Sequence, residues 1–457
     1  MKIVLFGMGE VYRENKDKIS KDDDVIAFID NNEQLQGTKY EEISVYGPKE
    51  VRNLPYEYIV IMSTYFIEMR DQLIQLGCKR EHILYYKEYI SRQKLGQLKV
   101  SYGKKFSHQD RKCLIITNQL GYHGGAIVAV YSALELQNRG YEVVIASQEG
   151  NDQFIDEFLK QGITFAVYPN LQFAKWGELF WIKDFDRIIV NTYPMILCAI
   201  EISRHREVTV WLHENDIAYP ELNFWKDIVI QNISNSNLNL HAVSSVAREN
   251  FFHNVAKAHI ELLPYGIPDR NQKNQLKNQK LTFAVIGTIQ QIKRQLLYLE
   301  AVRLLNQSYS QCEFLIIGAE REAEAAYVQS VLEEAEDINN VFVMGERTRL
   351  ELENIYPQID IVVVPSSQEA MSLVATEAMM YGKVCILSDI AGMADYVEDG
   401  KNGFIFRSDD VNDLAAHMAF CIENKEILHR IGENARSTYY QNFTLEALGN
   451  RLEKVLC

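Results

Sequence analysis

The chain has 457 residues, of which 47% are hydrophobic and 24% charged, a composition typical of a soluble protein long enough for two or three domains. Its formal net charge of −15 argues against nucleic acid as a partner, and a phosphate-bearing ligand must therefore be attracted by a local positive feature. No apolar run approaches the roughly 18–20 residues of a membrane span, and the opening MKIVLFGMGEVYRENK is typical of a strand rather than a secretory signal. We therefore expect a cytoplasmic protein.

The cysteines and acidic residues give no pattern of a metal site. The seven cysteines are scattered without a CxxC pair, which indicates reduced and mostly buried thiols. The run Asp22 to Asp24 is typical of a solvated turn, and His213 with Glu214 and Asp216 lacks a clear third ligand. We predict no metal.

The first segment, residues 1–95, alternates apolar runs with helical spacing, which predicts a small parallel sheet. Strands are expected at Ile3 to Phe6, Val25 to Ile29, Tyr58 to Met62 and His82 to Tyr85, and a helix near Ile67 to Leu76. A lysine-rich stretch from Ser91 to Arg111 follows and is predicted to be a linker.

The turn after the first strand keeps part of a dinucleotide-binding fingerprint. GMGEVY supplies Gly7 and Gly9 but places Tyr12 at the third glycine position, and Asp30 follows the second strand. The segment resembles the Rossmann-like domain at the N-terminus of hexapeptide-repeat sugar acyltransferases, which implies a nucleotide or nucleotide-sugar site at Gly7, Gly9 and Asp30. A purely structural or assembly role is the alternative.

The second unit, residues 111–270, opens with a strand at Leu114 to Thr117 and a glycine-rich loop. Gly124 and Gly125 in this loop would let a backbone approach a diphosphate closely, although a tight strand-to-helix turn uses the same residues. His213 stands just past a later strand, where ligands of open parallel sheets collect, but a lone histidine can equally be structural. The segment Phe173 to Lys183 interleaves aromatic residues with lysines and predicts buried packing, with peripheral contact at the inner face of a membrane as the alternative.

The third unit, residues 280–440, follows a polar connector, DRNQKNQLKNQK. It opens with a strand, a loop that contains Lys293 and Arg294, and an amphipathic helix. Another strand ends at Val343, where a loop of Met344 to Arg347 follows, and a final helical segment occupies residues 441–457.

The stretch from Val364 to Phe406 carries the strongest functional pattern. A strand ends at Pro365, and helical spacing then begins, with Glu369 at its start and Glu377 eight residues on, so that both carboxylates are expected on one helical face. A helix N-terminus at Ala370, Met371 and Ser372 would favour a diphosphate, and carboxylates accept hydrogen bonds from sugar hydroxyls. Two solvated surface glutamates are the alternative.

The order of residues in PSSQEAMSLVATEAMMYGKVCILSDIAGMADYVEDGKNGFIF resembles the donor-binding signature of glycosyltransferase family 4, whose members are retaining enzymes of the GT-B fold. The resemblance includes Gly382, Asp389, Gly392, Gly400 and Gly403 at the usual intervals. It implies that Glu369 contacts the transferred sugar and Glu377 holds the ribose of the donor. It further implies that His213 reaches the donor sugar.

The same resemblance assigns further donor contacts. The family's phosphate-binding loop offers an arginine and a lysine; Lys293 fits the lysine position, whereas Thr288 and Ile292 stand where the arginine is often found, and Arg294 is the substitute. The loop at Gly345 would hold the base by backbone contacts, and Gly124 and Gly125 would face the diphosphate. Residues 441–457 are expected to cross back onto the first GT-B domain.

We therefore expect an α/β protein with two Rossmann-like domains facing a cleft, plus a small N-terminal Rossmann-like domain. The implied function is retaining transfer from a nucleotide-diphosphate sugar, UDP-sugar favoured over GDP- or dTDP-sugar, to a hydroxyl of a glycan, glycolipid or glycoprotein in cell-surface polysaccharide synthesis. No cofactor is required. The alternatives are a catalytically silent scaffold that binds a nucleotide sugar or a partner enzyme, and a nucleotide-sugar-modifying enzyme centred on the first domain. A homo-oligomer is also open.

Overall fold

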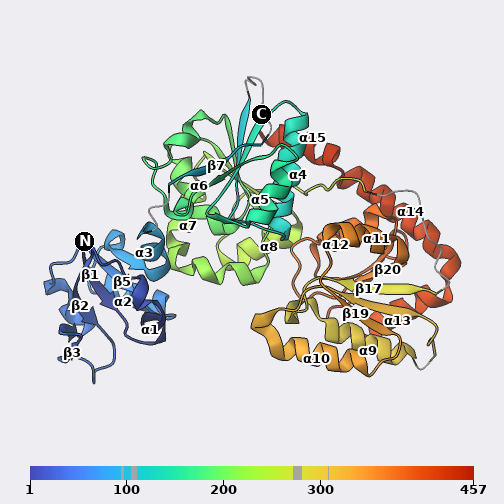
Figure 1. Ribbon diagram of the computed structural model, residues 1–457, viewed down its shortest axis with the longest axis horizontal. Helices are drawn as coiled ribbons and strands as arrows, with labels where there is room; N and C mark the ends of the chain where they lie inside the picture. The colour runs from blue at the N-terminus through green and yellow to red at the C-terminus, as the bar shows by residue number, and fades with distance from the viewer. Residues whose placement is uncertain (94–96, 104–110, 271–279, 307, 457) are drawn as a thin grey trace.

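The computed structural model describes residues 1–93, 97–103, 111–270, 280–306 and 308–456. Within these ranges the chain forms three large sheets that follow one another along the sequence, each covered by helices (Figure 1). They make up the blue, the cyan-to-green and the yellow-to-orange lobes of Figure 1. Most of the polar connector predicted before the third sheet, residues 271–279, lies outside the described residues.

The first sheet has the strand order β3-β4-β2-β1-β5-β6 and is parallel except for the β3–β4 pair. From the central β1 the chain first adds β2 on one side and later β5 on the other, so the strand order reverses beside β1. Its strands are β1 (Lys2–Phe6), β2 (Asp24–Ile29), β3 (Lys39–Tyr40), β4 (Ile43–Tyr46), β5 (Tyr58–Ile61) and β6 (Ile83–Tyr85). Its helices are α1 (Glu10–Asn15), α2 (Phe66–Gln75) and α3 (Tyr86–Gln93).

The second sheet has the order β16-β15-β14-β13-β8-β10-β12-β7, and β9 pairs with β11 beside it. Its strands are β7 (Lys99–Ser101), β8 (Lys112–Ile116), β10 (Glu142–Ser147), β12 (Thr164–Val167), β13 (Arg187–Val190), β14 (Val208–Leu212), β15 (Leu238–Ala242) and β16 (Ile260–Leu262), with β9 (Gln119–Leu120) and β11 (Glu149–Gly150) apart. Its helices are α4 (Gly124–Asn138), α5 (Asp152–Leu159), α6 (Ile196–Ser203), α7 (Lys226–Asn232) and α8 (Ser245–Asn254).

The stretch predicted to be a linker before this sheet is partly structured. β7 pairs antiparallel with β12 and forms one edge of the second sheet, so residues 99–101 belong to that sheet. The prediction of a plain linker from Ser91 to Arg111 is wrong for this strand. Pairing with β12 provides hydrogen-bond partners for the backbone of a short segment that has no strand pattern of its own. Residues 94–96 and 104–110 of the stretch lie outside the described residues.

The third sheet has the order β19-β18-β17-β20-β21-β22 and is parallel. Its strands are β17 (Thr282–Ile286), β18 (Glu313–Ile317), β19 (Val341–Gly345), β20 (Ile361–Val364), β21 (Val384–Ser388) and β22 (Phe404–Phe406). Its helices are α9 (Gln295–Asn306), α10 (Ala325–Glu336), α11 (Arg349–Ile355), α12 (Leu373–Met380) and α13 (Val411–Glu423), and α14 (Lys425–Asn442) and α15 (Leu445–Leu456) follow.

Central strands of these sheets are short apolar runs that are buried on both faces, as parallel sheets covered by helices require. One buried apolar cluster extends through all three sheets and contains Phe6, Ile116 and Val364. The three lobes therefore pack as one body through continuous apolar contact.

The N-terminal sheet domain docks on the second through aromatic and charged contacts. Tyr85 stacks on Phe224 with ring centroids 5.5 Å apart. The guanidinium groups of Arg70 and Arg80 lie 3.3 and 3.5 Å from the carboxylate of Asp227. The first domain is thus fixed against the second by specific contacts.

The C-terminal helices run from the third lobe back to the second, as the red ribbon in Figure 1 shows. α15 lies against α4, where Arg139 pairs with Glu453 at 2.7 Å. Gly449 allows the close approach, because a Cβ there would lie 2.1 Å from Nε of Arg139. This helix therefore links the last sheet domain to the middle one.

The aromatic segment Phe173 to Lys183 is mainly packed inside the second domain. Phe173, Leu179 and Ile182 are buried, whereas Phe180 is exposed. Buried packing therefore accounts for most of the segment. Among the described helices, none is both long and apolar enough to cross a membrane.

Candidate functional site

The loops at the carboxyl ends of the second and third sheets meet. A Cβ on Gly124, which begins α4, would lie 3.6 Å from Cδ1 of Leu373, which begins α12. Ser244 donates a hydrogen bond to the carbonyl of Ala370, and the hydroxyls of Tyr265 and Thr376 lie 3.2 Å apart. Both helix starts therefore border one region between the two sheets, where ligands of parallel α/β domains bind.

Lys293 and Glu369 form an ion pair in this region. Lys293 ends the turn after β17, and its ammonium group donates to the carboxylate of Glu369. Ser366 also donates to that carboxylate, at 3.3 Å. The side chains are 25% and 13% exposed, so both remain within reach of a ligand.

A glycine fixes the backbone around Glu369. Glu369 forms a β-bridge with Ala391, and the amide of Gly392 donates to the Glu369 carbonyl at 2.9 Å. A Cβ on Gly392 would lie 1.9 Å from the carbonyl oxygen of Ala370, so no other residue fits without a backbone shift.

The helix carrying Glu377 begins later than the spacing predicts. α12 starts at Leu373, and its cap Ser372 accepts a hydrogen bond from the amide of Ala375 at 3.2 Å. Glu369 lies in the extended bridge before the helix, so the prediction that Glu369 and Glu377 share one helical face is wrong. The bridge to Ala391 competes successfully with helix formation at residues 369–371.

Glu377 is held by partners other than those of Glu369. One oxygen lies 2.5 Å from the guanidinium of Arg349, and the other accepts from the hydroxyl of Tyr356 at 2.8 Å. Only 6% of the Glu377 side chain is exposed. The carboxylate predicted to hold a ribose is therefore enclosed in this structure.

Arg294 is directed at the loop after β22, where it pairs with Asp409. Both residues have positive φ, of 52° and 66°, which only a well-held turn tolerates outside glycine. The predicted donor contact by Arg294 thus has a competing partner.

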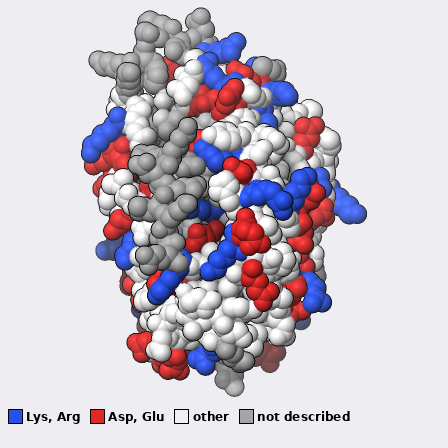
Figure 2. Space-filling view, turned by 90° about the vertical axis from the view of Figure 1, so that its right-hand side faces the viewer, with Lys and Arg blue, Asp and Glu red and all other residues white. Residues whose placement is uncertain are grey.

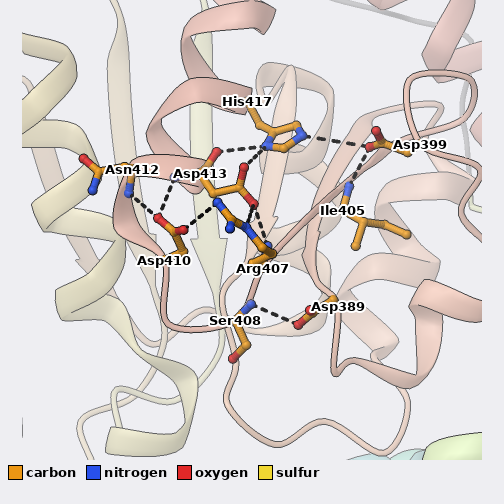
Figure 3. A network of polar contacts seen from close by, with 9 residues as sticks. All are labelled: Asp389, Asp399, Ile405, Arg407, Ser408, Asp410, Asn412, Asp413 and His417. Atoms are coloured by element: carbon orange, nitrogen blue, oxygen red, sulfur yellow. Dashed lines mark hydrogen bonds and ion pairs between the residues drawn. The ribbon is translucent and has the colours of Figure 1, made fainter.

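Figure 3 shows the polar network that holds this loop. Asp389 accepts from the amide of Ser408 at 2.9 Å, and Arg407 lies 2.8 Å from Asp410 and 3.4 Å from Asp413. The aspartate of the signature motif therefore supports the loop that carries Asp409.

His213 belongs to a hydrogen-bonded chain that ends at α4. Its Nε2 lies 3.0 Å from Oδ1 of Asn191, and the amide group of Asn191 donates to the carbonyl of Gly125 at 2.8 Å. Burial lowers the pKa of His213 to about 3, so the ring is neutral at pH 7. Because the amide oxygen can only accept, Nε2 carries the proton and Nδ1 is left as an acceptor.

Glu214, next to His213, has a structural role. Its carboxylate accepts from the hydroxyl of Thr192 at 2.6 Å and from the amides of Tyr193 and His213 at 2.9 and 2.8 Å. Burial raises its pKa. Within the described residues, no group of three or more His, Cys, Asp or Glu side chains is arranged to hold a metal ion.

The remaining predicted donor contacts are backbone positions. Gly124 and Gly125 form the first turn of α4, whose amides have no partner within the helix, and His123 caps it through Nδ1. Ala370 and Met371 are buried just before α12. Gly345 ends β19 with φ of 67°, and the position of its missing side chain is open.

In the first domain, Gly7, Gly9 and Asp30 line a cavity of about 820 Å³ beside β1, where the strand order reverses. The Asp30 carboxylate accepts from the amides of Met8 and Asn32, both at 2.9 Å, and so stabilises the turns around it. The charged side chains among the lining residues are all carboxylates, which disfavours a diphosphate.

Several residues of the candidate site were not predicted from the sequence. Asn191 follows the end of β13 and could have been found as a polar residue at a strand end, in the way that His213 was. Arg349, Tyr356 and Tyr131 belong to no motif and are united only by the fold. Arg349 lies with its guanidinium carbon 5.8 Å from the ring centroid of Tyr131.

Comparison with known proteins agrees with this architecture. Residues 267–438 match the family of group 1 glycosyl transferases, and residues 1–84 match the N-terminal domain of C2185-like proteins. The crystal structure of Anabaena Alr3699/HepE in complex with UDP-glucose superposes with a TM-score of 0.64 at 18% identity, over 76% of this chain and 99% of that one. The chain has the GT-B fold, and residues 267–438 are similar to group 1 glycosyl transferases. The GT-B fold expected from the sequence is thereby confirmed.

Two curated relatives are similar in sequence. The lipopolysaccharide 1,2-N-acetylglucosaminetransferase of Salmonella typhimurium is 31% identical over 200 residues, which are 41% of this GT-B chain and 51% of that enzyme. The trehalose synthase of Thermococcus litoralis is 20% identical over 288 residues, 58% of this chain and 67% of that enzyme. The chain thus spans about half the length of the Salmonella relative.

Proposed function

We propose that the chain transfers a sugar from a nucleotide-diphosphate sugar to a hydroxyl group, with retention of configuration at the anomeric carbon. The observation that carries this proposal is the Lys293–Glu369 pair, which lies beside the start of α12 and within the matched glycosyl transferase region. A cation next to a carboxylate suits a ligand that has both phosphates and sugar hydroxyls. We assign Lys293 to the diphosphate and Glu369 to the transferred sugar.

Because the chain has a net negative charge, binding of an anionic diphosphate depends on a local cation such as Lys293. Acidic and basic side chains are interspersed on the face of the third domain that Figure 2 shows, and the chain as a whole carries −15. One cation 4 Å from a phosphate contributes about 4 kcal/mol at an effective dielectric constant near 20. Because Arg294 pairs with Asp409, we assign the principal cationic contact to Lys293, together with the amides that begin α4 and α12.

In the proposed reaction, the acceptor oxygen forms a bond to the anomeric carbon while the bond from that carbon to the diphosphate oxygen breaks on the same face. The acceptor proton passes to the leaving phosphate, so the protein needs no carboxylate base. Lys293 and the helix amides stabilise the charge that develops on the diphosphate. His213, neutral at pH 7, would accept a hydrogen bond from a sugar hydroxyl through Nδ1.

A UDP-sugar is the donor that we favour, because the Anabaena protein with the same fold was crystallised with UDP-glucose. Neither curated relative's name specifies the nucleotide of its donor, so GDP- and dTDP-sugars are tested beside UDP-sugars. The Salmonella relative is a lipopolysaccharide N-acetylglucosaminetransferase, which favours a glycan or lipid-linked acceptor over a free sugar.

Thermal unfolding in the presence of UDP-, GDP- and dTDP-sugars tests donor binding, since a ligand at 100 times its Kd stabilises by about 2.7 kcal/mol. Release of free nucleotide from the stabilising donor then tests catalysis. We expect one nucleotide class to stabilise the protein and its sugar to be hydrolysed slowly in the absence of an acceptor. Binding without any nucleotide release from any donor, also with acceptors added, would instead identify a scaffold.

A further inference from the structure

Arg349 lies against Glu377, the carboxylate that is predicted to hold the ribose of the donor. It begins α11, directly after the loop that follows β19, and its guanidinium lies 2.5 Å from the Glu377 carboxylate. Tyr356 donates to the other carboxylate oxygen at 2.8 Å. One oxygen of Glu377 therefore accepts a hydrogen bond from the chain, and the other lies within ion-pair distance of Arg349 but accepts no hydrogen bond of its own.

Little space is left beside this carboxylate. The cavity lined by Arg349, Tyr356 and Glu377 has a volume of about 10 Å³, which is at most enough for one water molecule. With only 6% of its side chain exposed, Glu377 cannot receive two ribose hydroxyls in this arrangement. Arg349, at 29% exposed, is the more accessible member of the pair.

The guanidinium of Arg349 also contacts the other GT-B domain. Its central carbon lies 5.8 Å from the ring centroid of Tyr131, which is buried on α4 in the second sheet domain. Cation–π contacts of this kind are attractive and need the two partners to stay together. The position of Arg349 thus depends on how the two domains are placed.

We propose that Arg349 is a gate of the donor site: it occupies Glu377 when the site is empty, is supported by Tyr131 across the domain boundary, and must swing away before a ribose can bind. This proposal rests on the proposed function, because the gate has a role only if the chain binds a nucleotide donor whose ribose is held by Glu377. Separation of the two domains withdraws Tyr131 from Arg349 and so favours the open gate. Donor affinity and domain placement are thereby coupled.

The gate predicts that removing Arg349 strengthens nucleotide binding, whereas a supporting role would weaken it. Arg349→Met removes the charge and keeps an unbranched side chain. UDP binding to the full chain is measured by isothermal titration calorimetry. We expect a Kd about tenfold lower than that of the wild type, which is the gain if the gate is open in about one molecule in ten.

Three further substitutions and one control isolate the mechanism. In a Glu377→Gln background, Arg349→Met should give no gain, because the carboxylate for which ribose and guanidinium compete is gone. Tyr131→Leu leaves the ion pair but removes the aromatic face, and should lower the Kd of UDP about threefold, whereas Tyr131→Phe should restore the wild-type value. Arg303→Met, which removes a surface arginine paired with Glu334 in the same domain, is the matched control and should change nothing.

Unfolding temperatures identify any variant that fails to fold. If Arg349→Met does not fold, the Kd of UDP for Tyr131→Leu tests the gate in its place. Equal or weaker UDP binding by the folded Arg349→Met protein, with binding intact in the wild type, overturns the gate and leaves the proposed function standing. Failure of the wild type and the Arg349 variant to bind any nucleotide overturns both.

Discussion

At the scale of single residues, Lys293 and His213 have different tasks that follow from their surroundings. Lys293 is partly exposed, is paired with the carboxylate of Glu369 and faces the region between the domains. His213 is enclosed and neutral at pH 7, so it can offer hydrogen bonds but no charge. The electrostatic part of catalysis is therefore expected to depend on the lysine.

Lys293→Ala should lower kcat/KM by about two orders of magnitude, because one preorganised group that stabilises the developing charge is lost. Steady-state kinetics with the donor identified by thermal shift measures the effect. Lys401→Ala, which removes an exposed lysine paired with Glu398, serves as the control. Unchanged kinetics of the Lys293 variant would remove that residue from the site.

The low pKa of His213 has a consequence for stability. A histidine titrates near 6.5 when unfolded but at about 3 here, so the unfolded chain binds the extra proton between these values. Stability is therefore fully present above pH 6.5 and is lost as the pH falls towards 3. Between pH 7 and pH 5, the wild type should lose about 2 kcal/mol more unfolding free energy than His213→Gln. Urea titrations at the two pH values check this, and equal losses would show that the histidine is not held neutral.

At the scale of elements, the extended segment before α12 decides the geometry of the site. It places Glu369 by the bridge to Ala391 and delays the helix until Leu373. The contact of Ala370 with Ser244 then joins this segment to α8 of the other domain. One tight backbone crossing thus positions both the helix and the domain boundary.

Gly392→Ala tests that crossing. The added methyl group would lie 1.9 Å from the Ala370 carbonyl and 2.6 Å from Oγ of Ser244, so the backbone must shift, at a cost of about 3 kcal/mol. We expect a lower unfolding temperature together with weaker donor binding. Gly177→Ala, where a Cβ would meet nothing within 4 Å, should leave both unchanged. Normal donor binding by the Gly392 variant would argue against this role of the crossing.

At the scale of the whole molecule, the N-terminal domain is a docked body remote in sequence from Lys293 and Glu369. Arg70 and Arg80 share Asp227 as their counter-charge across the boundary, and Tyr85 stacks on Phe224. Burial lowers the pKa of Arg80, although the nearby carboxylates oppose this effect. The docking thus depends on a partly buried charge cluster.

Asp227→Asn should lower the free energy of docking between the first and second domains by about 1–2 kcal/mol. The loss is smaller than for a fully buried ion pair, because Asp227 is partly exposed. The unfolding temperature should fall, while kcat/KM stays within about twofold of the wild type because Lys293 and Glu369 belong to the third domain. Asp17→Asn in the same N-terminal domain is an exposed control. A large loss of kcat/KM would show that the first domain takes part in the reaction.

Much of the fold can be predicted from the sequence, because its causes are local. The runs that became β1, β8, β17 and β20 are apolar and end at glycine, proline or polar residues, which specifies strand and turn without reference to distant parts of the chain. The ordered motif around Glu369, Glu377 and Gly392 likewise predicted a donor site, and this stays a prediction. Lys293 was predicted from the resemblance of its loop to the family's phosphate-binding loop.

The three α/β units, their order and the residues of a possible donor site can be predicted from local patterns, since strand and helix signals are carried by neighbouring residues. Which charges meet depends on how distant elements pack together. Arg349 and Tyr356 reach Glu377, Asn191 reaches His213 and Tyr131 reaches Arg349 because separate elements are packed together. Pairing across elements depends on packing, which no local pattern encodes, and it is this pairing that encloses Glu377 and directs Arg294 to Asp409.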